Sequence, residues 1–174
     1  MERLYLARKI TRSKWDPKPY TGEGVRADAI TSCLRTQEDS LSFWRCNHDP
    51  LDVKEVILAL ALGEKRDRLD KIEIVLLEQK RLISDGFVFK PTDGDTLVSD
   101  LRARHLDLVE LSLMKLYMLA SHIIKVTRGS SEAYYFYSFN EKNVTAIVKA
   151  ATIAGRVEEK NLPPKMQEQL TKIK

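Results

Sequence analysis

The strongest indication of the fold is the run IEIVLL at residues 72–77. It is nearly continuous in apolar and β-branched side chains, broken only by Glu73. That pattern is typical of a β-strand that is covered on both faces. A strand of this kind requires a sheet with other elements packed on each side, so the run predicts a layered structure of strands and helices.

Shorter elements are predicted on both sides of this run. Alternating apolar residues predict further strands at residues 3–10, 41–46, 87–89 and 133–139. Apolar residues at helical spacing predict helices at residues 25–34, from Asp52 to Gly63, and from Asn140 or Asn143 to Ala154. The order of elements predicts an α+β fold, with a single mixed sheet packed by helices. The alternative is a doubly wound α/β sheet.

A long central helix is predicted within residues 100–126. Asp107 and Glu110 have the spacing of helix-start residues, so we expect the helix to begin near Asp107. Met114 and Tyr117 are among the side chains that we expect on its core face.

The domain organisation follows from length and from the C-terminal pattern. The 174 residues suit one domain, predicted at 1–155, followed by a helical arm or tail at 156–174. The arm has a weakly amphipathic pattern that suits docking on its own domain or on a partner, and a partner interface is predicted there. The residues of this pattern are Leu162, Met166, Leu170 and Ile173.

Composition excludes several classes of protein. Hydrophobic residues make up 43% and charged residues 31% of the chain, which is an ordinary globular balance. The mean hydropathy is −0.32, and no apolar run approaches the ~18 residues of a membrane span, so no membrane association is expected. Two cysteines and a charged N-terminus without a signal-peptide pattern favour the reducing cytoplasm.

The common catalytic and cofactor motifs do not occur in the sequence. None of the seven glycines has the spacing of a dinucleotide or phosphate loop, and no serine lies in a GxSxG turn. Cys33, Cys46 and His48 do not form the two paired ligand sets of a structural zinc site. We therefore expect no metal and no cofactor, and leave open whether the chain is an enzyme.

Two arginines share a predicted strand face with large apolar side chains. Arg8 lies on the side of Leu4 and Leu6, and Arg45 on the side of Phe43. An arginine in such a place is costly unless it is paired or faces a cleft. The pair predicts either an anion pocket, since guanidinium binds carboxylate or phosphate, or separate structural ion pairs.

The loop that follows the first strand interleaves cations with aromatic residues. Arg12, Lys14, Trp15 and Lys18 suit phosphate contacts and base stacking. The alternative is a solvated connection with Trp15 anchored in the core. Together with Arg8 and Arg45, these residues form the candidate ligand site for an anion or nucleic acid.

Three functions are compatible with these observations. We favour a protein-interaction or regulatory component, a subunit of a larger assembly or a homo-oligomer, because aromatic and amphipathic segments occur without a recognisable catalytic set. The alternative is binding of nucleic acid or a phosphate-bearing ligand through the basic, aromatic-containing N-terminal loop. The third is an enzyme that uses an arginine-lined cleft.

Overall fold

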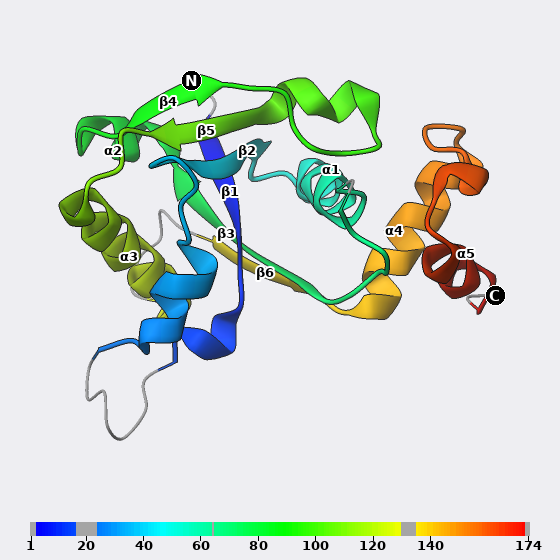
Figure 1. Ribbon diagram of the computed structural model, residues 1–174, viewed down its shortest axis with the longest axis horizontal. Helices are drawn as coiled ribbons and strands as arrows, with labels where there is room; N and C mark the ends of the chain where they lie inside the picture. The colour runs from blue at the N-terminus through cyan, green and yellow to red at the C-terminus, as the bar shows by residue number, and fades with distance from the viewer. Residues whose placement is uncertain (1–2, 17–23, 64, 130–134, 173–174) are drawn as a thin grey trace.

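The chain folds around one antiparallel sheet (Figure 1). In this computed structural model residues 3–16, 24–63, 65–129 and 135–172 are described. Their six strands lie in the order β4-β5-β2-β1-β3-β6, and every neighbouring pair is antiparallel. The prediction of an α+β fold is therefore confirmed. The sheet is antiparallel rather than mixed, and the parallel strands that a doubly wound sheet needs do not occur among the described residues. The strands are β1 (Leu4–Ile10), β2 (Leu41–Asn47), β3 (Ile72–Glu78), β4 (Val88–Pro91), β5 (His105–Val109) and β6 (Tyr135–Phe139).

Strand β3 is buried on both faces, as the run IEIVLL predicts. It pairs with β1, Ile10 opposite Glu73, and with β6, Ile72 opposite Phe139. Ile72, Ile74 and Leu76 belong to a core cluster on one face of the sheet, and Val75 and Leu77 to a second cluster on the other face. Because side chains alternate along a strand, both halves of the run are withdrawn from water.

Helices cover the two faces separately. Helices α1 (Pro50–Ala61), α4 (Glu141–Ile153) and α5 (Pro164–Lys172) contribute to the first cluster, while α2 (Gln79–Ser84) and α3 (Leu113–Thr127) contribute to the second. Figure 1 shows α2 and α3 on one side of the strands and α1, α4 and α5 on the other. The two cores explain why a sheet with mainly apolar central strands is stable here.

The helix starts differ in part from the prediction. Asn140 caps α4 as expected, because its side chain accepts a hydrogen bond from the Asn143 N–H at 2.9 Å. Helix α1 starts earlier than Asp52: Asp49 accepts from the Leu51 N–H at 2.8 Å, and Pro50 occupies the first turn, where its missing N–H costs nothing. The Asp52 carboxylate instead binds Arg104 and the Asn47 N–H.

The expectation that the long helix begins near Asp107 is wrong. Residues His105–Val109 form β5, paired with β2 and β4, and Ser112 caps α3 by accepting from the Lys115 N–H. Glu110 has φ of 56°, a left-handed conformation that ends the strand and separates it from the helix. The alternation of Leu106 and Leu108 with polar residues is the strand pattern that the cap spacing concealed.

Helix α3 is nevertheless the longest described helix, and it covers one face of the sheet. Its buried side comes from residues 119–127, including Leu119, Ala120 and Ile123. Met114 and Tyr117, expected on the core face, are 66% and 70% exposed. In this part of α3 it is Leu116 and Met118 that pack against the core cluster instead.

Two smaller elements also differ from the prediction. The expected helix at 25–34 is reduced to a five-residue π-helical segment, Ala29–Cys33, which packs into the α3 side of the core. Helix α2 follows β3 directly and was not predicted, because its six residues are too short for a clear period.

The C-terminal segment packs on the rest of the chain. Leu162, Met166 and Leu170 are 3%, 1% and 4% exposed and belong to the same core cluster as α1 and α4. Of the two docking modes left open by the sequence, the structure shows contact with the chain's own core. Ile173 lies outside the described residues. None of the described helices has the length and apolar content needed to cross a lipid bilayer.

Candidate functional site

The Arg8 side chain lies on one face of the sheet, where main-chain carbonyl groups bind it. Its Nε and Nη2 donate to the Cys33 carbonyl at 3.1 and 2.7 Å, and its Nη1 donates to the Ser42 carbonyl at 2.8 Å. Burial lowers the pKa of Arg8 to about 10, so the guanidinium stays charged at neutral pH. The sequence suggested an acidic partner, but carbonyl oxygens accept the hydrogen bonds instead. Arg8 therefore connects β1 to β2 and to the π-helical segment.

Arg45 lies on the same face of the sheet as Arg8. It is paired with Leu6 in the register of β1 and β2, and Leu6 is two residues before Arg8. Arg45 is half-buried, and no ion pair joins it to another described residue. The two arginines therefore share a face, but neither lines the groove or the basic pocket considered below. Because the Arg8 guanidinium already donates to main-chain carbonyls, Arg8 and Arg45 are not assigned to a common anion site.

The basic loop after β1 is only partly available for ligands. Trp15 is 1% exposed and packs in the α3 side of the core, so its ring is not free to stack on a base. Arg12 lies over the Phe136 ring at 4.9 Å and donates to the Thr127 carbonyl at 3.4 Å. Lys14 is half-buried at the surface. Lys18 lies outside the described residues.

The cysteines do not provide a reactive site. Both are free and buried, and burial raises the pKa of the Cys46 thiol to about 12. A thiol with that pKa is a poor nucleophile because the thiolate is the reactive form. In the part of the chain that the structure describes, no three His, Cys, Asp or Glu side chains come together in a way that could hold a metal ion.

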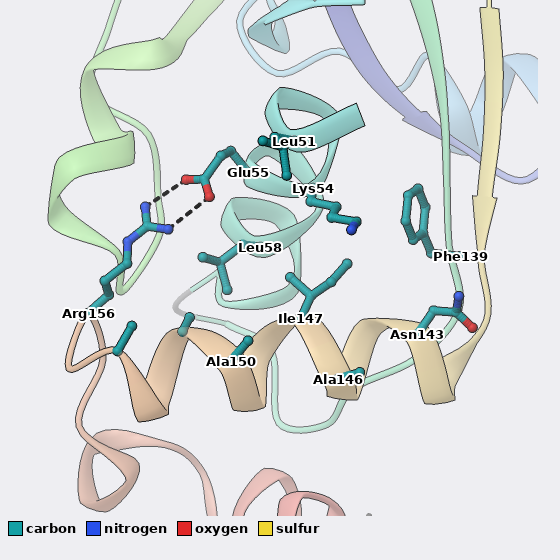
Figure 2. Close-up of a pocket in the computed structure, with 12 residues that line it drawn as sticks. Leu51, Lys54, Glu55, Leu58, Phe139, Asn143, Ala146, Ile147, Ala150 and Arg156 are labelled. Carbon is teal, nitrogen blue, oxygen red and sulfur yellow. Dashed lines mark hydrogen bonds and ion pairs between the residues drawn. The ribbon is translucent and has the colours of Figure 1, made fainter. Parts of the chain in front are cut away.

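A groove between α1 and α4 forms an apolar concavity. Its volume is about 580 Å³, and Figure 2 shows α4 crossing below α1 with side chains of both helices directed into the space. Leu51 at its rim is 71% exposed, and Leu58 forms part of its buried wall. The other lining residues are Lys54, Glu55, Phe139, Asn143, Ala146, Ile147, Ala150, Ala151, Ala154 and Arg156.

One end of the groove is closed by a charged cluster. Arg156 donates to both carboxylate oxygens of Glu55, at 2.9 and 2.7 Å, and to Asp100 at 2.6 Å. These hydrogen bonds, that to Glu55 above all, raise the pKa of Arg156. The bidentate geometry joins α1 to the segment after α4 and therefore holds the two helices at their present separation.

The other end of the groove is open and positively charged. Lys54 is exposed on α1, and Figure 2 shows its side chain directed toward the Phe139 end of the groove. Among the described residues no carboxylate pairs with Lys54, whereas the neighbouring Glu55 is neutralised by Arg156. An apolar groove with one uncompensated cation at its rim suits an amphipathic partner that carries an acid.

Sequence reasoning did not find this groove. Its residues come from 51–58 and 139–156, which are distant in the chain and meet only because β6 lies beside β3. A usable signal was the exposed small-residue row Ala146, Ala150 and Ala154, spaced four apart on one helix face.

The fold and groove define an antiparallel α+β protein with a helix-lined concavity. Comparison of the chain with protein-family models, with curated proteins and with solved structures finds no match.

Proposed function

We propose that this protein is a protein-interaction or regulatory component that binds an amphipathic helix of a partner protein in the α1–α4 groove. The observation that carries the proposal is the exposed apolar lining of this groove, with Leu51 at 71% exposure. Exposed apolar concavities rimmed by polar residues are typical of interaction sites. Two free, buried cysteines support a cytoplasmic location for such a component.

The dimensions of α4 support a helical occupant. The groove follows α4 from Asn143 to Ala154, which spans about 17 Å at the rise of an α-helix. A partner helix of about three turns matches that length. The methyl groups of Ala146 and Ala150 leave room for close approach, and Ile147 and Leu51 supply apolar contact.

The charge at the rim defines the partner further. Lys54 favours an aspartate or glutamate on the partner helix, at the end that lies near Phe139. The partner helix therefore carries an apolar face and an acid at one end of it.

A photo-crosslinking residue at position 150 tests the proposal. We expect it to capture a partner in cells, and we expect a peptide from the captured segment to bind in fluorescence anisotropy. Leu51→Glu should weaken that peptide at least about tenfold, since it places a charge against an apolar contact. Lys54→Glu should weaken it too, and an acid-to-lysine change in the peptide should restore binding.

Leu113→Glu is the matched control, because Leu113 is 85% exposed on α3, across the sheet from the groove. The proposal is wrong if Leu113→Glu weakens the peptide as much as Leu51→Glu does. It is also wrong if position 150 crosslinks only to a second copy of this chain.

A further inference from the structure

A second cavity lies at the end of β1, away from the α1–α4 groove. Its volume is about 520 Å³, within the range of small-molecule sites. Its walls are the last residues of β1 with Thr11 and the segment that leads into β3. We call it the basic pocket; its lining residues are Lys9, Ile10, Thr11, Lys65, Arg66, Asp67, Arg68, Asp70, Lys71 and Glu73.

The three carboxylates of the basic pocket already have cationic partners. Asp67 pairs at 2.7 Å with Lys165 of α5, which is not part of the lining. Asp70 pairs with Arg68 at 3.1 Å. The third carboxylate, Glu73, pairs with Lys71 at 2.6 Å and also accepts from the main-chain N–H of residue 12 at 2.8 Å. The acids are therefore engaged in structural contacts.

Cationic groups remain after this pairing. The lining holds five cations against three carboxylates, a net formal charge of two positive charges. Among the described residues, no carboxylate pairs with Lys9 or Lys65. The Nε atom of Arg66 is buried and has no hydrogen-bond partner in the described part of the chain, and its Nη2 lies 3.7 Å from Asp70. Trp15 Nε1 and Arg26 Nε are also buried without a partner among the described residues, so the Arg66 Nε atom supports an acceptor in the pocket only together with the excess of cations around it.

The cations also repel one another. Desolvation, and then the positive charge of Arg66, lower the pKa of the Lys9 ammonium below its ordinary value, although the negative charge of Asp70 acts in the opposite direction. An anion in the pocket would relieve both the repulsion and the unsatisfied Arg66 donor.

We propose that the basic pocket binds a small ligand that bears two or more phosphate groups. Lys9 and Lys65 supply point charges and Arg66 supplies a directed N–H donor, a combination suited to phosphate oxygens. A small ligand is favoured over single-stranded nucleic acid because Trp15 in the adjacent loop is buried and no aromatic ring lines the pocket. The site is separate from the groove of the proposed function.

Calorimetric titration of the full chain with inorganic pyrophosphate tests this site. We expect binding in low-salt buffer, with the affinity falling as salt is raised. Lys9→Ala and Lys65→Ala should each weaken pyrophosphate about tenfold, the loss of roughly one charge-assisted contact. Lys65→Arg should retain most of the affinity, because it keeps the charge.

Lys90→Ala is the matched control, since Lys90 is an exposed lysine on the edge strand β4, which lies three strands away from β1. Circular dichroism of each variant checks that the fold is intact. The proposal is overturned if pyrophosphate does not bind, or if Lys90→Ala weakens it as much as Lys65→Ala. It is also overturned if a single-stranded oligonucleotide binds far more tightly than pyrophosphate and displaces it.

Discussion

Replacing Arg8 with methionine tests whether the hydrogen bonds of this arginine stabilise the fold. Methionine keeps the aliphatic stem of the side chain and removes the guanidinium, so packing changes little while three hydrogen bonds are lost. The Cys33 carbonyl loses two donors, and the Ser42 carbonyl loses one. Ser42 is exposed, so water can replace its donor, whereas Cys33 is only 5% exposed.

The size of the loss follows from these contacts. A hydrogen bond from a charged donor contributes about 1.5–3 kcal/mol, and a buried acceptor left without a donor costs about 1–3 kcal/mol. Removal of a buried charge returns part of its desolvation cost. We therefore expect Arg8→Met to lower the free energy of unfolding by about 2–3 kcal/mol, which corresponds to about 4–12 °C in Tm for a chain of this size.

Urea denaturation followed by tryptophan fluorescence measures this change, because Trp15 and Trp44 are both buried and report on the two cores. Arg45→Met is the matched control: it removes an arginine from the same sheet face and should change stability by less than about 0.5 kcal/mol. If Arg8→Met is as mild as Arg45→Met, the carbonyl contacts do not stabilise the fold and the reasoning fails.

Three further predictions concern stability. Gly94→Ala should lower Tm in a thermal melt, because an added Cβ would lie 2.3 Å from the Trp44 ring, which is rigid and buried; an unchanged Tm would show that the loop moves freely away. Asp49→Ala should lower the urea-derived free energy of unfolding by about 1 kcal/mol, through loss of the α1 cap, and Asp49→Asn should retain most of it. Stability should fall as the pH is lowered from 7.5 to 5. Burial lowers the pKa of both His105 and His122 in the folded chain, whereas histidine in the unfolded chain keeps its ordinary pKa of about 6.5. The unfolded chain therefore binds protons before the folded chain does, which favours unfolding. Full stability is expected above about pH 7.5, where histidine is neutral in the folded and the unfolded chain, and a Tm that rises on acidification to pH 5 would contradict this sign.

Several elements were predictable because their signals are local. The run at 72–77 is apolar at consecutive positions, and only burial on both faces satisfies that pattern. Asn140 caps α4 through a hydrogen bond to a residue three positions away. Strand β5 was missed for a related reason. Asp107 and Glu110 match a helix start, and a short-range pattern does not distinguish that start from a strand of only five residues.

The candidate sites were predictable only in part. Arg8 was identified as unusual because a charged side chain shares a face with Leu6. Its carbonyl partners at Cys33 and Ser42 lie 25 and 34 residues away, so no local pattern indicates them. The aromatic and basic loop suggested stacking on a nucleic acid, but Trp15 is directed into the core.

Part of the secondary structure was determined by the sequence alone. Strands β1, β2 and β3 and the start of α4 follow from the pattern of neighbouring residues. The order of the strands and the pairing of distant segments set the surfaces. Antiparallel pairing of β3 with β6 positions α4 across α1 and forms the groove, while β1 and residues 65–71 meet to form the basic pocket. Such contacts depend on which apolar faces bury one another, a long-range free-energy balance that residue spacing does not encode.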